Sequence, residues 1–566
     1  MRIKSKMGFM VRSVIVVVAL CLAVVGAKAQ DVERAARDFD LGRATEILAN
    51  MMREFDVSYV EDITADELLD AAAKGMIAAT DPYTEYLSES ALDDFELMTT
   101  GRSGGVGSLI RKRGDYVIFA QPYKGSPSDL AGIKIGDKIL AIDGEDMRGC
   151  TTEDVSTRLK GEPESGVTVV VEHNIGAVVD TVRLQRRRIS IPSVTYAGIL
   201  RDGIGYVAHN DFIEDSYGEM RRAIEALMAT DTLRGIILDY RSNGGGVMKE
   251  AVDIASLFVP RGSRVVSIMG RDSASLVHYD TRHAPIAEHL PIVVLVNGTS
   301  ASASEILAGA LQDMDRAVIM GSRTYGKGLV QSTNYLGYNT YLKLTTSKYY
   351  IPSGRCIQSR NYAAMRRDGA SAEVPDSLIS EFSTLGGRKV YDGGGIVPDV
   401  KVEPEYVSRF AITLYAMGYM DDWADKYMRS HHDRSIDVRT FCITDEDYAD
   451  FVEYIGECDV PYESETRHAL KALEKAVEND LYDEELQPII AELKAKIKDD
   501  KLSNMETYRS EIIDALNSHI VLRYAYSEGV TERAAVDDEA VQRAIELLLD
   551  GDEYSRILSQ QNLSMH

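Results

Sequence analysis

A short apolar run that passes through a serine-rich turn into a helix constrains this sequence most. Residues 291–296 are apolar and β-branched, as in a buried strand, and residues 306–311 have the character of a helix. Ser302 stands in the turn between them. Backbone N–H groups and the positive end of a helix dipole converge at such a turn and can stabilise an oxyanion. The pattern predicts an α/β fold with Ser302 as a candidate nucleophile. The alternative is structural, since Ser302 and Glu305 also have the spacing of a helix-capping box.

Lys327, twenty-five residues after Ser302, is the candidate base. A lysine acts as a general base near neutral pH only if desolvation lowers its pKa from about 10.4 toward 7 or 8. The flanking residues Gly326 and Gly328 permit close approach of the backbone, and the segment 322–334 contains no acidic residue. The neutral amide of Gln331 can orient the amine without raising its pKa. The alternative is a glycine-rich turn that carries a solvated lysine.

Residues 297–316 and 321–331 together resemble the signature of the C-terminal processing, or tail-specific, serine peptidases. The likeness extends over about residues 35–400. It implies that Ser302 is the nucleophile, Lys327 the base and Gln331 the residue that orients the base. It also implies a multidomain α/β fold, with a helical N-terminal region, a PDZ-like β-rich domain, a peptidase core of the ClpP/crotonase type and a helical C-terminal domain.

A strand that runs into glycines 244–246 resembles the family segment that supplies part of the oxyanion hole. The resemblance implies that the backbone N–H of Ala303 acts together with that of Gly245 or Gly246. The chain departs from the family pattern with Tyr240 in place of leucine and Gly244 in place of proline. Because the extra glycine makes the turn more mobile, the choice of donor stays open.

The segment from Gly104 to about Arg188 alternates short strands and turns and resembles a PDZ domain. Such a domain captures the end of a polypeptide by strand addition, with an apolar pocket for the last side chain. A bulged strand would explain the first glycines equally well. The resemblance implies these tail-binding residues: Val106, Gly107, Ser108, Leu109 and Ile110.

The chain has 566 residues, too many for one hydrophobic core. Its first 29 residues have a basic start, an apolar run and a small-x-small cleavage site at Ala27-Lys28-Ala29, which predicts an export signal. We therefore expect a protein of the periplasm or cell envelope of a bacterium, attached to the membrane only if the signal stays uncleaved. The expected domains are a signal peptide (1–29), an N-terminal helical region (30–95), a PDZ domain (96–187), a peptidase core (188–402, with an insertion at about 359–393 that reads as a loop or lid) and a C-terminal helical domain (403–566).

The formal net charge of -26 argues against nucleic acid as a partner, because the phosphate backbone would repel such a surface. Without the signal peptide, the chain keeps Cys150, Cys356, Cys442 and Cys458. A disulfide between Cys442 and Cys458 and four free thiols are equally compatible with export. The sequence has no C-x-x-C or H-E-x-x-H motif, and we expect neither a metal nor a cofactor.

These observations favour an exported serine endopeptidase. It would use a Ser/Lys dyad and a PDZ domain to cleave polypeptides with apolar C-terminal tails. One alternative is a catalytically silent scaffolding protein that binds peptides on a peptidase fold. A second is a Ser/His hydrolase that uses His209, which stands near the end of an expected strand. Delivery of substrates by an adaptor or lipoprotein partner stays open.

Overall fold

The computed structural model describes residues 36–89, 100, 102–230, 232–362, 372–373, 376–480, 483–497 and 501–559. The chain divides into two compact units, residues 1–86 and 87–566. The first unit contains a helix over residues 36–58, then α2 (Ala65–Ile77), and is followed by β1 (Glu85–Leu87). A reciprocal capping box between Thr64 and Glu67 starts α2. The expected signal peptide lies outside the described residues.

The segment expected to form a PDZ domain is an antiparallel sheet with a helix against it. Its strands follow the order β3 (Ser108–Arg113), β4 (Tyr116–Pro122), β5 (Lys138–Ile142), β7 (Gly166–Glu172) and β8 (Val179–Gln185), and β6 (Glu145–Asp146) pairs with β5. The remaining elements are α4 (Pro127–Leu130), α5 (Thr152–Leu159) and the pair β2 (Arg102–Gly105) and β9 (Arg187–Ser190). Alternate residues of β7 are buried, as expected for a strand with one face on a core. Strand β3 lies at the edge of this sheet.

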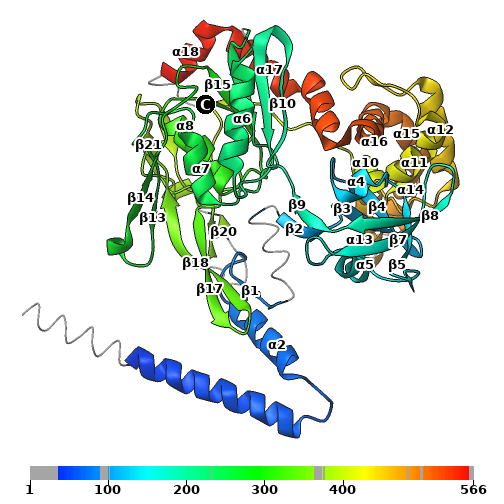
Figure 1. Ribbon diagram of the computed structural model, residues 1–566, viewed down its shortest axis with the longest axis horizontal. Helices are drawn as coiled ribbons and strands as arrows, with labels where there is room; N and C mark the ends of the chain where they lie inside the picture. The colour runs from blue at the N-terminus through cyan, green and yellow to red at the C-terminus, as the bar shows by residue number, and fades with distance from the viewer. Residues whose placement is uncertain are drawn as a thin grey trace, which may run out of the picture. The chain divides into compact units, whose positions relative to one another are not determined.

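The segment expected to form the peptidase core contains a six-stranded sheet covered on both faces (Figure 1). Its order is β10 (Val194–Ile199), β11 (Ile204–His209), β12 (Gly235–Asp239), β15 (Ile292–Val296), β16 (Val318–Gly321) and β23 (Val400–Lys401). Only β10 is antiparallel to its neighbour. Every residue of β11, β12 and β15 is buried, as is typical of parallel strands between two layers.

Helices α6 (Ser216–Met228), α7 (Met248–Ala255) and α8 (Ala303–Asp313) pack on one face of this sheet. The opposite face is covered by the last helices of the chain, α17 (Glu539–Leu549) and α18 (Gly551–Ser559). The buried side chains Ile545 and Tyr554 of these helices share a core with Ile237 and Leu295 of the sheet. Helices α17 and α18 therefore contribute to the core on this face of the sheet.

A second, antiparallel sheet contains β13 (Arg264–Met269), β14 (Val277–Asp280), β17 (Leu329–Gly337) and β18 (Thr340–Tyr350). Shorter elements are the pairs β19 (Arg360–Asn361) with β20 (Ala372–Glu373) and β21 (Glu381–Ser383) with β22 (Lys389–Tyr391), and the 3-10 turns η2 (Arg201–Gly203), η3 (Ser273–Ser275) and η4 (Asp376–Leu378).

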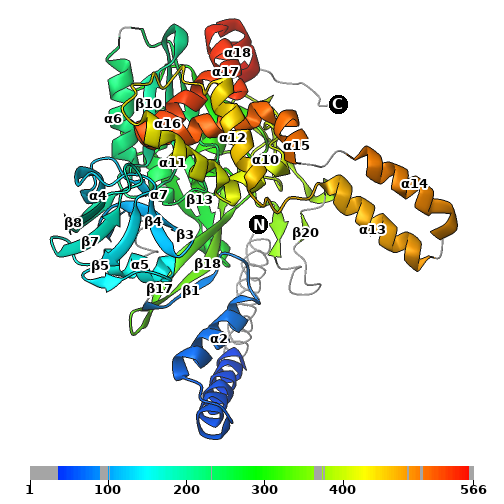
Figure 2. The ribbon, with the colours of Figure 1, turned by 90° about the vertical axis from the view of Figure 1, so that its right-hand side faces the viewer.

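The C-terminal helical domain precedes α17. It consists of α10 (Arg409–Ala416), α11 (Tyr419–His431), α12 (Asp445–Glu457), α13 (Glu465–Asn479), α14 (Asp483–Lys496), α15 (Lys501–Thr507) and α16 (Arg509–Asp537). Trp423 is fully buried at its centre, in contact with Tyr427 and Phe451. Helices α13 and α14 form a hairpin that projects from the other helices (Figure 2). In the described part of the chain, every helix is too short or too polar to span a membrane.

Among the described residues, the cysteines at positions 150, 356, 442 and 458 are free thiols. Of the two alternatives left open for Cys442 and Cys458, the structure therefore has the free thiols and not the disulfide. The two residues lie at opposite ends of α12, and a helix of 13 residues is about 20 Å long. A disulfide tolerates a Cα separation of only about 7 Å.

Candidate active site

Ser302 lies at the end of the turn that joins β15 to α8, as the sequence predicts. Its backbone angles, φ 57° and ψ −114°, are unusual for a residue with a side chain. Such strain persists only where surrounding contacts enforce it, and it is concentrated at functional sites. The conformation leaves Ser302 half-buried directly before the first turn of α8. Ala303, the first residue of that helix, is buried.

Glu305 connects the serine turn to the lysine turn. Its Oε2 accepts hydrogen bonds from the backbone N–H groups of Ser302 and Lys327, each across 2.9 Å. Its Oε1 accepts from the hydroxyl of Thr324 at 2.6 Å and from the N–H of Gly326 at 2.7 Å. Burial raises the pKa of Glu305 to about 7, while the four hydrogen bonds act in the opposite direction. The sequence reading of Glu305 as a helix cap describes only the bond to Ser302, because the other three need the tertiary fold.

Lys327 is half-buried in a tight turn between two glycines. Gly326 has φ 84°, and a Cβ placed there would lie 2.5 Å from the Cβ of Ser359. No residue other than glycine fits that position without a shift. Gln331, on β17, donates through its amide to the hydroxyl of Thr345 at 3.1 Å. The close backbone approach inferred from the flanking glycines is therefore present at Gly326.

The glycines after β12 differ in their surroundings. Gly245 is buried against the serine turn, and a Cβ placed on it would lie 2.7 Å from the Cβ of Ser302 and 2.8 Å from the N of Ala303. Its own N–H donates to Oδ1 of Asn243 at 2.9 Å. Gly246 packs on a different neighbour, since a Cβ there would lie 2.3 Å from the carbonyl oxygen of Phe212. Gly245 is thus the glycine that borders Ser302 and Ala303.

Asn243 ties three segments together beneath this turn. Its Nδ2 donates to the carbonyl of His209 at 2.7 Å. Its own carbonyl accepts from the N–H of Ala301 at 3.0 Å and from the hydroxyl of Ser304 at 2.9 Å. Nothing in the sequence alone marks Asn243 as part of the site, although an asparagine before three glycines is a turn signal.

His209 is buried beneath the glycine turn and contacts the rings of Phe212 and Tyr240. Burial lowers its pKa to about 3, so the imidazole is neutral at pH 7. The described contacts of its side chain are with these two rings and with the amide of Asn243 at 3.5 Å. This is the environment of a packed core histidine.

Three ion pairs made by two arginines hold the far end of α8. Asp313 pairs with Arg355 at 2.8 Å, and both side chains are almost fully buried. Arg388, from the turn between β21 and β22, pairs with Asp315 at 2.6 Å and also with Asp399. Arg388 belongs to the insertion at about residues 359–393, which the sequence predicts to be a loop or lid. Its described C-terminal part is anchored in the protein by this arginine, and residues 363–371 lie outside the described residues.

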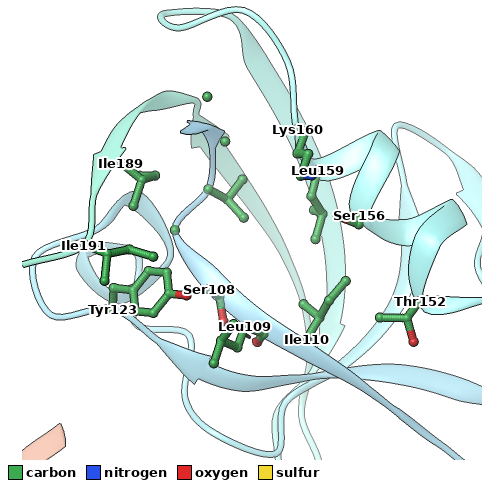
Figure 3. A pocket seen from close by; sticks show the side chains of 14 residues that line it. Ser108, Leu109, Ile110, Tyr123, Thr152, Ser156, Leu159, Lys160, Ile189 and Ile191 are labelled. Carbon is green, nitrogen blue, oxygen red and sulfur yellow. Dashed lines mark hydrogen bonds between the residues drawn. The ribbon is translucent and has the colours of Figure 1, made fainter. Parts of the chain in front are cut away.

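The five tail-binding residues expected in the PDZ domain, Val106 to Ile110, line one cavity of about 250 Å³. The opposite wall is α5, and Figure 3 shows Ile110 and Leu159 directed into the same space. Tyr123, Ile189 and Ile191 complete the lining. Because β3 is an edge strand, its free backbone groups face a groove that an extended peptide can enter.

Three segments match known families. Residues 118–173 match "PDZ domain", residues 203–363 match "Peptidase family S41", and residues 410–548 match "Probable PDZ-protease, C-terminal helical domain".

Similar proteins are also known. The chain is 33% identical over 304 residues to a "Carboxy-terminal-processing protease" of Bartonella bacilliformis. The aligned region covers 53% of this chain and 69% of that protein. It is 32% identical over 382 residues to a "Probable CtpA-like serine protease" of Staphylococcus aureus, and the aligned region covers 66% of this chain and 72% of that protein. Among solved structures, the photosystem II D1 C-terminal processing protease is 29% identical to this chain, with a TM-score of 0.34. The match covers 63% of this chain and 87% of the chain of that protease.

Proposed function

Because this chain belongs to the carboxy-terminal-processing proteases of peptidase family S41, it is a serine-type peptidase, and we propose that Ser302 and Lys327 form its catalytic dyad. The observation that carries this proposal is the pair of hydrogen bonds from Ser302 and Lys327 to one oxygen of Glu305. It keeps the backbones of the two residues together although they are far apart in sequence.

In the proposed reaction, the neutral amine of Lys327 takes the proton of Ser302 Oγ as that oxygen attacks the carbonyl carbon of the substrate. The tetrahedral intermediate places a negative charge on the carbonyl oxygen. The N–H of Ala303 and an N–H of the glycine turn, from Gly245 or Gly246, stabilise that charge.

The C–N bond then breaks, and the leaving amine receives the proton from Lys327. Water, deprotonated by Lys327, hydrolyses the acyl-enzyme and restores Ser302. The amide of Gln331 orients the lysine. The strained backbone of Ser302 and its position at the start of α8 support this assignment.

The substrates in this proposal are polypeptides with an apolar C-terminal tail. The groove between β3 and α5 supports the assignment, because its edge strand offers backbone groups and its lining is mostly apolar. We further propose that the protein is exported to the periplasm or cell envelope of a bacterium, on the basis of residues 1–29. A partner that delivers substrates stays a hypothesis.

The test compares the mature wild type with Ser302→Ala and Lys327→Ala. All three receive one unfolded protein that ends either in small apolar residues or in two aspartates. We expect cleavage by the wild type alone, with a higher kcat/KM for the apolar tail. Full activity of Lys327→Ala would overturn the dyad. Equal cleavage of both tails would overturn tail recognition and leave the dyad intact.

A further inference from the structure

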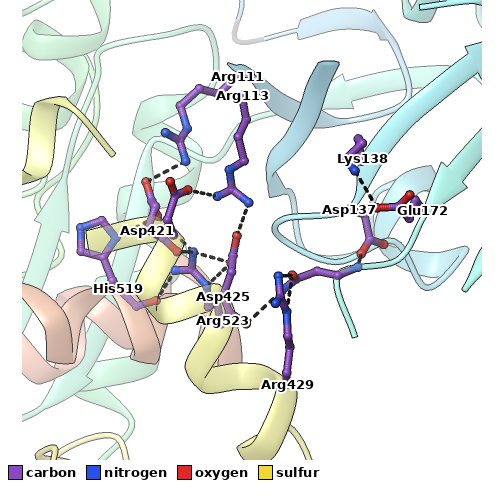
Figure 4. A network of polar contacts seen from close by, with 12 residues as sticks. Arg111, Arg113, Asp137, Lys138, Glu172, Asp421, Asp425, Arg429, His519 and Arg523 are labelled. Atoms are coloured by element: carbon purple, nitrogen blue, oxygen red, sulfur yellow. Dashed lines mark hydrogen bonds and ion pairs between the residues drawn. The ribbon is translucent and has the colours of Figure 1, made fainter. Parts of the chain in front are cut away.

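The strand that borders the tail groove is attached to the helical domain by partly buried ion pairs. Arg113 of β3 pairs with Asp425 of α11 at 2.7 Å, and Arg111 pairs with Asp421 at 3.3 Å. Behind them, Arg523 of α16 is only 3% exposed and contacts both aspartates. Figure 4 shows the two arginines of β3 directed toward α11. The helical domain therefore fixes the strand that would pair with a bound tail.

A second contact reaches the turn that follows β4. Asp129 lies in α4, and its Oδ2 accepts from the N–H of Gly125 at 2.8 Å. Its Oδ1 accepts from the hydroxyl of Tyr526 in α16 at 2.6 Å. The adjacent Ser128 donates through its hydroxyl to the carbonyl of Gly107 at 2.9 Å. A short chain of contacts thus leads from Tyr526 to Gly107, in the segment where a PDZ domain holds the terminal carboxylate.

The backbone of Tyr526 is distorted where it makes this contact. Its angles, φ 58° and ψ −170°, interrupt the helical geometry of α16. L-residues rarely adopt this region, and such a conformation persists only if its surroundings hold it. The break brings successive turns close, since a Cβ placed on Gly529 would lie 2.4 Å from the Cβ of Ala525. Burial and Asp129 raise the pKa of Tyr526 to about 12, so its hydroxyl stays a donor at neutral pH.

We propose that the C-terminal helical domain is part of the tail-recognition site, and that Tyr526 positions the carboxylate-binding turn of the PDZ domain through Asp129. This inference rests on the proposed recognition of polypeptide tails. Its ligand is the terminal carboxylate of a chain whose last side chain is apolar. Tyr526 is a positioning residue, because it touches Asp129 and not the groove.

The test measures binding of a labelled peptide with an apolar last residue to the full-length chain. The background carries Ser302→Ala, so that the peptide is not cleaved. Adding Tyr526→Phe removes only the hydroxyl, and we expect roughly tenfold weaker binding, as for a lost hydrogen bond to a charged group. The matched control is Lys124→Ala. Lys124 pairs with Glu528 across the same interface, but both are more than half exposed, so affinity should change less than about twofold.

Kinetics separate positioning from a general loss of structure. With Ser302 intact, Tyr526→Phe should raise KM for a tailed substrate, keep kcat, and leave cleavage of a substrate with two terminal aspartates unchanged. A uniform loss on both substrates, together with a lower melting temperature, would overturn the proposal in favour of a purely structural role for Tyr526.

Asp129→Asn tests the contact between Tyr526 and Asp129 from the side of Asp129 and leaves the sequence of α16 unchanged. Tyr526→Phe and Asp129→Asn should each weaken binding, and the double variant should bind about as weakly as the weaker single variant. Additive losses, or unchanged affinity in Tyr526→Phe, would overturn the proposal. If the Ser302→Ala background itself shows no preference for the apolar tail, the proposed tail recognition fails, which is a different result.

Discussion

The backbone N–H groups of Ser302 and Lys327 donate to the same oxygen atom, Oε2 of Glu305, across 2.9 Å in both cases. The two residues belong to turns that follow different strands, β15 and β16, and a single carboxylate holds the turns together. Any change in the charge or length of Glu305 therefore acts on the nucleophile and on the proposed base at once.

Glu305→Gln should lower kcat roughly 10- to 100-fold, because an amide cannot accept four hydrogen bonds as the carboxylate does, and each bond to a charged group is worth about 1.5–3 kcal/mol. Steady-state kinetics on a tailed substrate, with peptide binding measured separately, would check this. Affinity for the tail should stay unchanged. The control is Glu225→Gln, which alters an exposed glutamate paired with Arg221. A kcat within twofold of wild type would contradict the prediction.

Glu305 should also make stability depend on pH. Burial raises its pKa from the ordinary 4.5 to about 7, so the folded chain binds this proton more tightly than the unfolded chain. Its contribution is full below pH 4.5 and is lost as the pH rises through 7, a change of about 3 kcal/mol. Denaturant unfolding at pH 5 and pH 8 should show this loss in wild type and not in Glu305→Gln. The same pH dependence in both proteins would exclude Glu305 as its source.

Gly245→Ala should abolish measurable cleavage, since the new Cβ would lie 2.7 Å from the Cβ of Ser302 at a backbone φ of 99°. The neighbouring glycine provides the control. A Cβ on Gly244 meets nothing within 4 Å, so Gly244→Ala should keep activity within a few-fold of wild type. Initial rates on one tailed substrate compare the two variants. Equal rates would show that the turn is less closely packed than the distances require.

Asp313→Ala should destabilise the protein by about 3–5 kcal/mol, because it leaves the buried guanidinium of Arg355 without its ion-pair partner. The matched surface change is Arg221→Ala, which breaks a pair with Glu225 whose side chains are both 47% exposed. Its cost should stay below about 1 kcal/mol. Thermal or denaturant unfolding measures both. A similar cost for both variants would mean that the pair at the end of α8 contributes no more than a surface pair.

His209→Phe should keep activity within about tenfold of wild type, because phenylalanine preserves the ring that packs against Phe212 and Tyr240. Lys327→Ala should lose at least about 1,000-fold, as expected on removal of a catalytic base. Rates of the two purified variants on one substrate decide between a lysine and a histidine base. The reverse order of activities would favour the Ser/His mechanism.

The features that are predictable from the sequence depend on residues that are close together in the sequence. The strand, turn and helix around Ser302 follow from an apolar run and a helical pattern in one short segment. The residues from Val106 to Ile110 are contiguous, and they line one groove. The link between Glu305 and Lys327 depends on the approach of two distant turns, and no local pattern encodes it. The break in α16 at Tyr526 is equally hidden, since neither glycine nor proline stands at that position.

The packing of α17 and α18 on the peptidase sheet has a consequence for how the enzyme is made. The hydroxyl of Tyr554 hydrogen-bonds both the N–H and the carbonyl of Ile292, at the start of the strand that leads to Ser302. In a chain made from its N-terminus, β15 and Ser302 therefore emerge before the two helices that cover the opposite face of their sheet. We expect that face to stay uncovered, and the site to stay unfinished, until α18 has been made.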